Sequence, residues 1–545
     1  MVSVAGVGTE LNLAALHEAV AEAVPDRECL VWRDRRLSWA DLTDRTRRLA
    51  AVLADAGLGC HGTLADLPGW ESPHDHVALY LHNGNEYLEG MLGAAKARAA
   101  AVNVNYRYVA EELRYVLADS RARAIVFHGA FADTLAAVRD DLPDLRLLLQ
   151  VDDDSGAPLL PGAVPYEAAL ADAAPRAPEG LSPDDLYILY TGGTTGMPKG
   201  VLWRQADFLA ACLGITQSTE ELVAAARRRH LRALPAPPFM HGAAHWNALS
   251  AWSTGGTVLV QDDPAHLDPH DVLRTVARER ATSLLIVGDA FARPLVDALR
   301  TGEHDASSLR HLLTGGATLS ANVKDDLLEL LPQLQIVDVL GSSETGRQGV
   351  QTSTAGEGAT TGTFVRERSS VILSADLGRV LSPGDPELGW LAQTGRVPRG
   401  YLGDAAKTAR TFPVLDGVRY AVAGDRARLL ADGSLELHGR DSVTINTGGE
   451  KVFAEEVEQA LKRHPAVFDV VVVGRPSPRW GQEVVAVLEL RPGTDPGDDD
   501  LRATAAEHVA RYKVPKAFVR VPRVLRSPSG KPDYRWAAEQ ASASV

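Results

Sequence analysis

A run of glycine and threonine near the middle of the chain limits its fold and chemistry more than any other feature. It follows residues 186–189, Leu-Tyr-Ile-Leu, a short apolar segment that predicts a buried strand. The run itself, 190–200, has the sequence Tyr-Thr-Gly-Gly-Thr-Thr-Gly-Met-Pro-Lys-Gly. Glycine allows backbone N–H groups to approach an anion, and the threonine hydroxyls and the charge of Lys199 add further donors. The run therefore predicts a loop that holds phosphate groups.

This loop differs from the P-loop of many nucleotide-binding proteins. The P-loop lysine precedes Ser or Thr at the start of a helix, whereas Lys199 lies between Pro198 and Gly200. A flexible surface loop rich in glycine and threonine is the simpler alternative. The residues that we expect to contact phosphate are Thr191, Gly192, Gly193, Thr194, Thr195, Gly196 and Lys199.

Strand and helix patterns divide the chain into two parts. Apolar strands alternate with helical patterns before and after the loop, which predicts a layered α/β domain with a mostly parallel sheet. From about residue 435 the pattern changes to that of a compact α+β unit. A chain of 545 residues is also too long for one hydrophobic core. We therefore expect a large N-terminal domain at 1–440 and a small C-terminal domain at 441–545.

The bulk composition excludes several classes of partner. The formal net charge is −15, which argues against a general surface for nucleic acid or anionic membranes. No apolar run is long enough to span a bilayer, and residues 1–13 lack the basic start and apolar core of a signal peptide. Cys29, Cys60 and Cys212 are scattered, so they indicate neither a metal spacing nor a disulfide framework. We expect a cytoplasmic protein.

Two further segments of small residues follow predicted strands, where ligands bind in open α/β sheets. One is 314–317, Thr-Gly-Gly-Ala, which either lets the backbone approach a flat ring or forms a plain turn. The other is 341–346, Gly-Ser-Ser-Glu-Thr-Gly. Alone, Glu344 would be a solvated turn residue. Together with a phosphate loop, its carboxylate is better explained as a ligand for Mg²⁺.

Four charged or titratable residues complete the candidate site. Asp425 and Arg440 flank Asp432-Gly433, a predicted hairpin turn that would bring a ribose acceptor beside a phosphate donor. Each alone would be a surface charge. Lys531, in a C-terminal Gly-Lys pair, and His241 have equally plain alternatives, a solvated lysine and a neutral core histidine.

Taken together, these segments resemble the adenylate-forming superfamily of acyl-CoA synthetases, peptide-synthetase adenylation domains and luciferases. Five ordered motifs carry the resemblance over nearly the whole chain, which implies the fold of these enzymes with a small mobile C-terminal domain. It implies that Lys531 is the catalytic lysine, that Glu344 and Thr195 hold Mg²⁺, and that His241 gates the acyl pocket. The ATP or AMP site would add Gly315, Gly316, Ala317, Gly341, Ser342, Ser343, Thr345, Asp425 and Arg440 to the phosphate loop. The hinge and CoA side would be formed by Ser442, Gly448, Gly449, Glu450 and Lys451.

The chain departs from the family pattern at two positions. Leu340 stands where the family commonly has an aromatic residue that stacks on adenine, so stacking is either weaker or supplied elsewhere. Ser442 replaces the usual hinge aspartate or lysine, which need not stop rotation because a hinge only has to absorb a change in φ and ψ.

The resemblance implies an AMP-forming acyl-CoA synthetase with ATP, Mg²⁺ and CoA as cofactor and co-substrates. The chain most resembles actinobacterial ligases for fatty and steroid acids at Met197, Trp203-Arg204, 239–246 and 341–346, which favours a bulky steroid or terpenoid carboxylate. Medium- or long-chain fatty acids are the alternative substrates. A stand-alone enzyme that loads a carrier protein and a luciferase-like oxidase are alternative functions, while a catalytically inactive binding module is disfavoured. A homodimer is an open alternative to a monomer.

Overall fold

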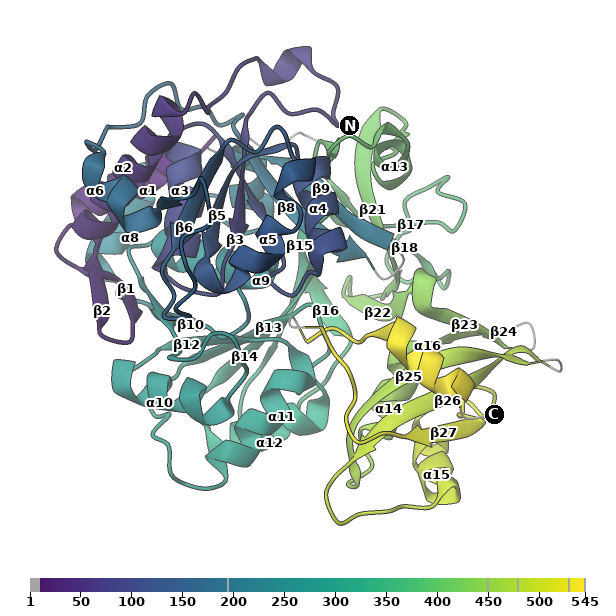
Figure 1. Cartoon of the computed structure of the whole chain (residues 1–545). Coiled ribbons are helices and arrows are strands. Elements are labelled where there is room, and N and C mark those ends of the chain that lie inside the picture. The colour runs from purple at the N-terminus through teal and green to yellow at the C-terminus, as the bar shows by residue number, and fades with distance from the viewer. Residues whose placement is uncertain (1–9, 194–195, 448–449, 478–479, 528–529, 544–545) are drawn as a thin grey trace.

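The computed structural model describes residues 10–193, 196–447, 450–477, 480–527 and 530–543 (Figure 1). The N-terminal part forms a large layered α/β domain, and the C-terminal part forms a smaller domain beside it (Figure 1). None of the helices within these ranges is both long and apolar enough to cross a membrane. The helices are α1 (Leu13–Ala23), α2 (Trp39–Asp55), α3 (Asn85–Lys96), α4 (Ala110–Asp119), α5 (Ala132–Ala136), α6 (Tyr166–Asp172), α7 (Gln205–Ala211), α8 (Thr219–Arg228), α9 (Gly242–Trp252), α10 (Pro269–Glu279), α11 (Gly288–Leu299), α12 (Ala321–Leu330), α13 (Ala405–Thr411), α14 (Ala454–Leu461), α15 (Asp498–His508) and α16 (Tyr534–Ala543).

The largest sheet of the described residues is only half parallel. Every pair of neighbouring strands from β14 to β1 is parallel, whereas every pair from β17 to β14, and the pair of β1 with β2, is antiparallel. The expectation of a mostly parallel sheet therefore holds for only part of it. In sheet order the strands are β17 (Ser370–Leu373), β18 (Gly389–Thr394), β21 (Val418–Leu429) with β20 (Val414–Leu415) at its side, β22 (Leu435–Arg440), β16 (Thr363–Arg366), β15 (Gly346–Ser353), β14 (Gln335–Ser342), β13 (His311–Gly315), β12 (Ser283–Ile286), β10 (Arg232–Pro235), β11 (Thr257–Val260), β1 (Glu28–Trp32) and β2 (Arg35–Ser38).

Strand β12 carries three consecutive apolar residues because both faces of the sheet are covered there. Leu284 and Ile286 of β12 pack with helices α10, α11 and α12, while Leu285 between them packs with the core on the opposite face. Successive side chains of a strand point to opposite faces, so an uninterrupted apolar run is what a doubly covered strand requires.

Two smaller sheets complete the large domain. One is fully parallel and the other carries the glycine- and threonine-rich run on a β-hairpin. The parallel sheet has the order β4 (Ala100–Asn103), β3 (His76–Tyr80), β5 (Ala122–His128), β6 (Leu147–Val151) and β7 (Val164–Pro165). The other has the order β19 (Gly400–Tyr401), β9 (Gly196–Arg204) and β8 (Leu186–Gly193).

The C-terminal domain has its own sheet and core. Val470 and Val472 of β25 pack with α14 and α15, whereas Val471 and Val473 pack with α16 on the other face. The sequence patterns predict strands at 470–473 and 483–490 and helices at 455–462 and 501–510, which match parts of β25, β26, α14 and α15, but they do not predict β23, β24, β27 or α16. The sheet order is β24 (Glu450–Phe453), β23 (Thr444–Thr447), β26 (Gly481–Leu490) and β25 (Val467–Ser477), with β27 (Ala517–Arg520) parallel to β26.

Helix α3 is buried along its whole length, and its small residues make this possible. A Cβ atom on Gly93 would lie 2.6 Å from Cδ2 and 2.7 Å from Cγ of Leu49 in α2. We expect Gly93→Val to lower the free energy of unfolding by about 2 kcal/mol, because overpacking a rigid contact is costly. Denaturant titration checks this value. Because Leu49→Ala makes room, the same substitution should cost less in that background, and an equal cost in both would contradict the packing argument.

Candidate functional site

The ends of neighbouring parallel strands bring most of the predicted site together. His241 follows β10, Val287 follows β12, Gly315 ends β13, and Gly341 lies near the end of β14. These strands are adjacent in the sheet, so their carboxyl ends lie along one edge, where open α/β sheets bind ligands.

The glycine- and threonine-rich run forms the end of the β8–β9 hairpin. Gly193 pairs with Gly196 across it, and Thr191 pairs with Lys199. Thr194 and Thr195, both predicted to contact phosphate or Mg²⁺, lie outside the described residues. Lys199 lies within strand β9, which agrees with the argument from sequence that no helix begins at Lys199.

Asn103, which sequence reasoning missed, fixes the base of this hairpin. Its side chain accepts a hydrogen bond from the N–H of Tyr190 at 2.7 Å and donates to the carbonyl of Tyr190 at 2.8 Å. It also donates to the carbonyl of Met240 at 2.8 Å. The side-chain amide of Asn103 thereby connects the base of the β8–β9 hairpin to the segment before His241.

Lys199 has a carboxylate partner that the sequence did not indicate. Its Nζ lies 2.7 Å from Oδ2 of Asp404, and this hydrogen bond raises the pKa of Lys199. Asp404 also caps α13 by accepting from the N–H of Lys407 at 2.8 Å. Lys199 is therefore held charged at the hairpin, and a phosphate group would compete with Asp404 for it.

Glu344 lies in the turn between β14 and β15, held toward the hairpin. Its Oε1 accepts a hydrogen bond from the Tyr401 hydroxyl at 2.9 Å. Burial and the charge of Glu344 raise the pKa of Tyr401, so this phenol stays a donor. Tyr401 belongs to β19, which pairs with β9. The carboxylate is thus positioned by the same small sheet that carries the phosphate loop.

The turn around Glu344 depends on glycine. A Cβ atom on Gly341 would lie 2.2 Å from the carbonyl oxygen of Gly346. Inside the turn, the N–H of Ser342 donates to Oγ1 of Thr345 at 3.1 Å. From outside, Trp203 Nε1 donates to the carbonyl of Ser343 at 2.9 Å.

Asp425 and Arg440 lie together, as the hairpin turn between them predicts. They are register partners of β21 and β22, and Arg440 Nε lies 3.3 Å from Asp425 Oδ1. The charge of Asp425 raises the pKa of Arg440.

Lys531 reaches this group from the C-terminal domain. Its Cε lies 3.7 Å from the position of a Cβ atom on Gly316, at the end of β13. Its backbone is fixed by a 2.9 Å hydrogen bond from the N–H of Ser527 to its carbonyl. Desolvation by the surrounding protein is the largest cause that lowers the pKa of Lys531, and the charge of Arg440 is the second. The charges of Glu344 and Asp425 partly offset both. The side chain keeps exposed surface, so an incoming substrate can reach it.

His241 and His245 have different environments. His245 bonds to the Phe239 carbonyl through Nδ1 at 2.6 Å and to the Tyr187 hydroxyl through Nε2, which makes it a structural residue. His241 Nε2 is buried and has no hydrogen-bond partner among the described residues. Burial and the charge of Lys531 lower the pKa of His241 to about 3, so it is neutral at pH 7.

The residues predicted on the CoA side lie elsewhere. Glu450 and Lys451 belong to β24, in a hairpin that projects away from the large domain (Figure 1). Lys451 Nζ lies 3.6 Å from Asp441 Oδ1, beside Ser442 in a short 3₁₀ turn. Gly448 and Gly449 lie outside the described residues. In this orientation of the domains, the structure does not bring Glu450 or Lys451 into contact with the phosphate loop.

One cysteine has neighbours that its spacing in the sequence did not indicate. Cys60 lies with His74 and Asp185, and their ligand atoms are within 4.8 Å of one another. Arg98 already neutralises that carboxylate, however, with Nη2 2.8 Å from Oδ1 of Asp185. His74 Nε2 lies 3.3 Å from the same oxygen. The group is therefore a charge-compensated part of the fold.

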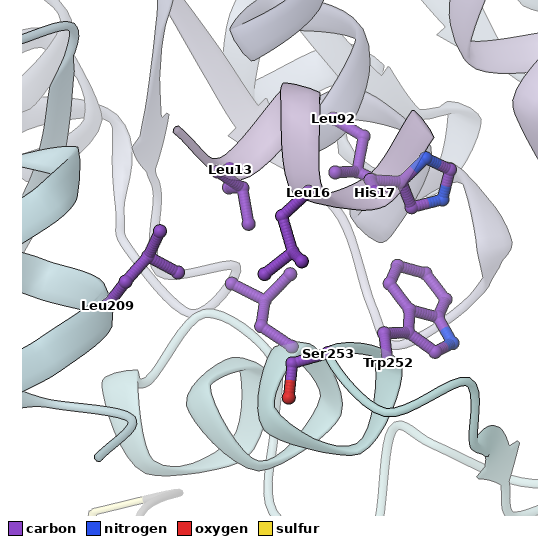
Figure 2. Close-up of a pocket in the computed structure, with 8 residues that line it drawn as sticks. Leu13, Leu16, His17, Leu92, Leu209, Trp252 and Ser253 are labelled. Carbon is purple, nitrogen blue, oxygen red and sulfur yellow. The ribbon is translucent and has the colours of Figure 1, made fainter. Parts of the chain in front are cut away.

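A small cavity lies under α1, away from the residues above (Figure 2). It offers about 10 Å³ to the centre of a water molecule, roughly the room of one water and far too little for an acyl chain. The imidazole of His17 and the indole of Trp252 lie at one end of it (Figure 2). Its lining is formed by Leu13, Leu16, His17, Leu92, Leu209, Leu249, Trp252 and Ser253.

Known proteins resemble the chain along almost its whole length. The family described as "AMP-binding enzyme" matches residues 17–402, and "AMP-binding enzyme C-terminal domain" matches 456–531. The medium-chain acyl-CoA ligase Mig of Mycobacterium avium is 52% identical over 98% of both chains. A 3-oxocholest-4-en-26-oate–CoA ligase of Rhodococcus rhodochrous is 40% identical over 97% of this chain and 96% of its own.

Solved structures confirm the expected fold class. The anthranilate CoA ligase AuaEII, in complex with anthranoyl-AMP, superposes with a TM-score of 0.83 at 21% identity and covers 98% of both chains. A benzoate CoA ligase from Burkholderia xenovorans has a TM-score of 0.78 at 20% identity and covers 97% of this chain and all of its own. Both the fold and the resemblance inferred from the sequence are confirmed. This chain belongs to the AMP-binding enzyme family, as an acyl-CoA ligase with a large N-terminal and a small C-terminal domain.

Proposed function

We propose that the chain joins a bulky polycyclic carboxylate, a steroid or terpenoid acid, to CoA through an acyl-adenylate, with the domain boundary after Arg440. The observation that carries this proposal is the convergence of Lys531, Glu344 and the Asp425–Arg440 pair on the strand ends around Gly316. The Rhodococcus relative is named for a steroid acid, which supports the substrate class. The relative in Mycobacterium avium is named for medium-chain acids, which keeps a fatty acid as the second candidate.

In the first step, a carboxylate oxygen of the acid attacks the α-phosphorus of ATP, and the bond to pyrophosphate breaks. Lys531 would donate to the acid and the α-phosphate as negative charge shifts between them, a contact that counts most in the transition state. Asp425 would accept from the ribose hydroxyls, and Arg440 would donate to ribose or phosphate. The phosphate loop and Lys199 would hold the departing pyrophosphate.

The residues around Glu344 fit a magnesium ion. The Tyr401 hydroxyl donates to Oε1 of Glu344, and within the described ranges Oε2 forms no hydrogen bond, so one carboxylate oxygen remains as an acceptor. We infer that Glu344 holds Mg²⁺, with Thr195 as the expected second contact. When bound, the ion would neutralise charge on the ATP phosphates.

In the second step, the thiol of CoA attacks the acyl carbon and AMP leaves. The small domain would first rotate about Ser442 and withdraw Lys531 from its place beside Gly316. Rotation would also carry Glu450 and Lys451 toward the site, where CoA would meet them. His241 is half-buried and neutral, with the charge of Lys531 close enough to lower its pKa, which suits a gate to the acyl pocket and not a general base.

The test is acyl-CoA formation with ATP, Mg²⁺ and CoA across steroid side-chain acids and linear C8 to C18 acids, with pyrophosphate followed in parallel. A polycyclic acid with the highest kcat/KM supports the proposal. A linear acid with the highest kcat/KM would favour the second candidate. Pyrophosphate release without acyl-CoA would indicate a carrier protein as the acceptor and contradict the assignment of CoA.

The lowered pKa of Lys531 predicts an alkaline limit on adenylation. Only the charged amine can stabilise the transition state, so the rate is full below this pKa and is lost as pH rises through it. We expect kcat/KM for pyrophosphate release to fall with an apparent pKa below the ordinary 10.5 of lysine. Lys531→Arg should shift this fall in kcat/KM to higher pH, because arginine stays charged. If kcat/KM falls at the same pH in both enzymes, the group that titrates is not residue 531.

A further inference from the structure

A buried ion pair crosses the contact between the two domains, away from the phosphate loop. Lys462, the residue after α14, places its Nζ 3.1 Å from Oδ2 of Asp289 at the start of α11. The two side chains are only 5% and 2% exposed. Asp289 is oriented from its own domain by the N–H of Ser320, which donates to Oδ1 at 2.7 Å.

The negative charge of Asp289 is maintained in the folded protein. Burial alone would raise the pKa of Asp289, but Lys462 and Arg293 outweigh it and the pKa is lowered. Arg293 also points Nη2 at the carbonyl of Lys462 from 3.5 Å, and Asn322 Nδ2 does the same from the same distance. The C-terminal end of α14 therefore lies against the large domain through both its backbone and its side chain.

Further polar contacts connect Lys462 to the loop that carries Lys531. Lys462 Nζ lies 3.7 Å from Oδ1 of Asp469, and Asp469 forms a two-pronged ion pair with Arg526 at 2.6 and 2.7 Å. Arg526 then donates from Nη1 to the carbonyl of Gly530 at 3.0 Å. Gly530 is the residue before Lys531, so these contacts connect the large domain to the catalytic loop.

The large domain contacts this loop directly at the segment that carries Asp289. Gly530 has a φ of +73°, and a Cβ atom there would lie 3.0 Å from the carbonyl oxygen of Val287. Val287 is two residues before Asp289. One short segment at the end of β12 thus contacts the small domain twice, at Lys462 and beside Lys531.

We propose that Lys462 is a positioning residue for adenylate formation, because its ion pair with Asp289 latches the small domain in the orientation that places Lys531 beside Gly316. This inference rests on the proposed function. The latch has to open when the small domain rotates, so it favours the first half-reaction and opposes the second. A buried pair suits this purpose, because a lost partner leaves an uncompensated charge at the interface.

Two half-reactions measured separately test the latch. Lys462→Met is expected to lower the single-turnover rate of pyrophosphate release at least tenfold, while the rate of thioester formation from supplied acyl-adenylate and CoA stays equal or rises. Lys462→Arg should recover most of the first rate, because it restores the charge facing Asp289. Arg491→Met is the matched control: it removes an exposed contact across the same interface, 3.7 Å from Asp297, and should leave both rates unchanged.

A second measurement does not depend on activity. Hydrogen exchange should rise in 288–299 and around Lys531 in Lys462→Met, but not in Arg491→Met. Asp289→Asn should raise hydrogen exchange in the same two segments, and this variant replaces Lys462→Met in the test if Lys462→Met does not fold. An equal loss in both half-reactions, or unchanged exchange in the folded variants, would overturn the latch. The two proposals can fail separately. If the wild-type enzyme forms no adenylate from any acid, but the variants show the expected rise in hydrogen exchange, the proposed function is contradicted and the ion-pair latch is still supported.

Discussion

Replacing Lys531 with alanine is expected to slow pyrophosphate release by about 10²–10³-fold, the usual loss when one donor to a developing charge is removed. The Cε atom of Lys531 lies against Gly316 at the strand ends. The charges of Glu344, Asp425 and Arg440 all affect the pKa of this lysine. The loss should appear in kcat more than in the KM for ATP, because the contact matters most in the transition state. Single-turnover release of pyrophosphate with the preferred acid measures it.

The same substitution should leave the second half-reaction nearly unchanged. If Lys531 withdraws before CoA attacks, supplied acyl-adenylate will be converted to acyl-CoA at close to the wild-type rate. Lys516→Ala is a suitable control, since Lys516 is an exposed lysine of the same domain. Equal loss in both half-reactions would mean that Lys531 supports the fold and not a single chemical step.

Glu344→Gln is expected to raise the Mg²⁺ concentration needed for half-maximal adenylation at least tenfold. The amide keeps an oxygen that can accept from Tyr401 but loses the charge that a hard cation prefers. Titration of Mg²⁺ at fixed ATP measures the shift, and calorimetry of ATP binding with and without Mg²⁺ measures it independently of turnover.

The neighbouring phenol provides the control for this experiment. Tyr401→Phe removes the hydrogen bond that orients Glu344 while keeping the carboxylate, so it should shift the Mg²⁺ requirement less than Glu344→Gln does. A Glu344→Gln enzyme with an unchanged Mg²⁺ requirement would show that Glu344 does not hold the ion.

The parts of the site that sequence predicted were those with a local signal. The apolar segment at 186–189 predicts the strand that precedes the glycine- and threonine-rich run, because strand patterns are recognised within a few positions. The Asp432-Gly433 turn predicts that Asp425 and Arg440 become neighbours, and they are register partners. The ends of parallel strands account for Gly315 and Gly341.

The site residues that the sequence did not predict contact the site from distant positions in the chain. Asp404 lies 205 positions beyond Lys199 in the chain, and Asn103 lies 87 positions before Tyr190, so no local pattern links either pair. The same holds for Lys462 and Asp289, which belong to different domains. The antiparallel half of the large sheet was also missed, since short strands separated by loops carry little information about their pairing.

Analysis of the nucleotide products tests the central claim most directly. With the preferred acid and ATP but no CoA, quenched reactions examined by mass spectrometry should contain acyl-AMP and pyrophosphate, near one equivalent per enzyme. Addition of CoA should convert the acyl-AMP to acyl-CoA and AMP. ADP and phosphate as the products, or acyl-CoA formed without passing through acyl-AMP, would contradict the account.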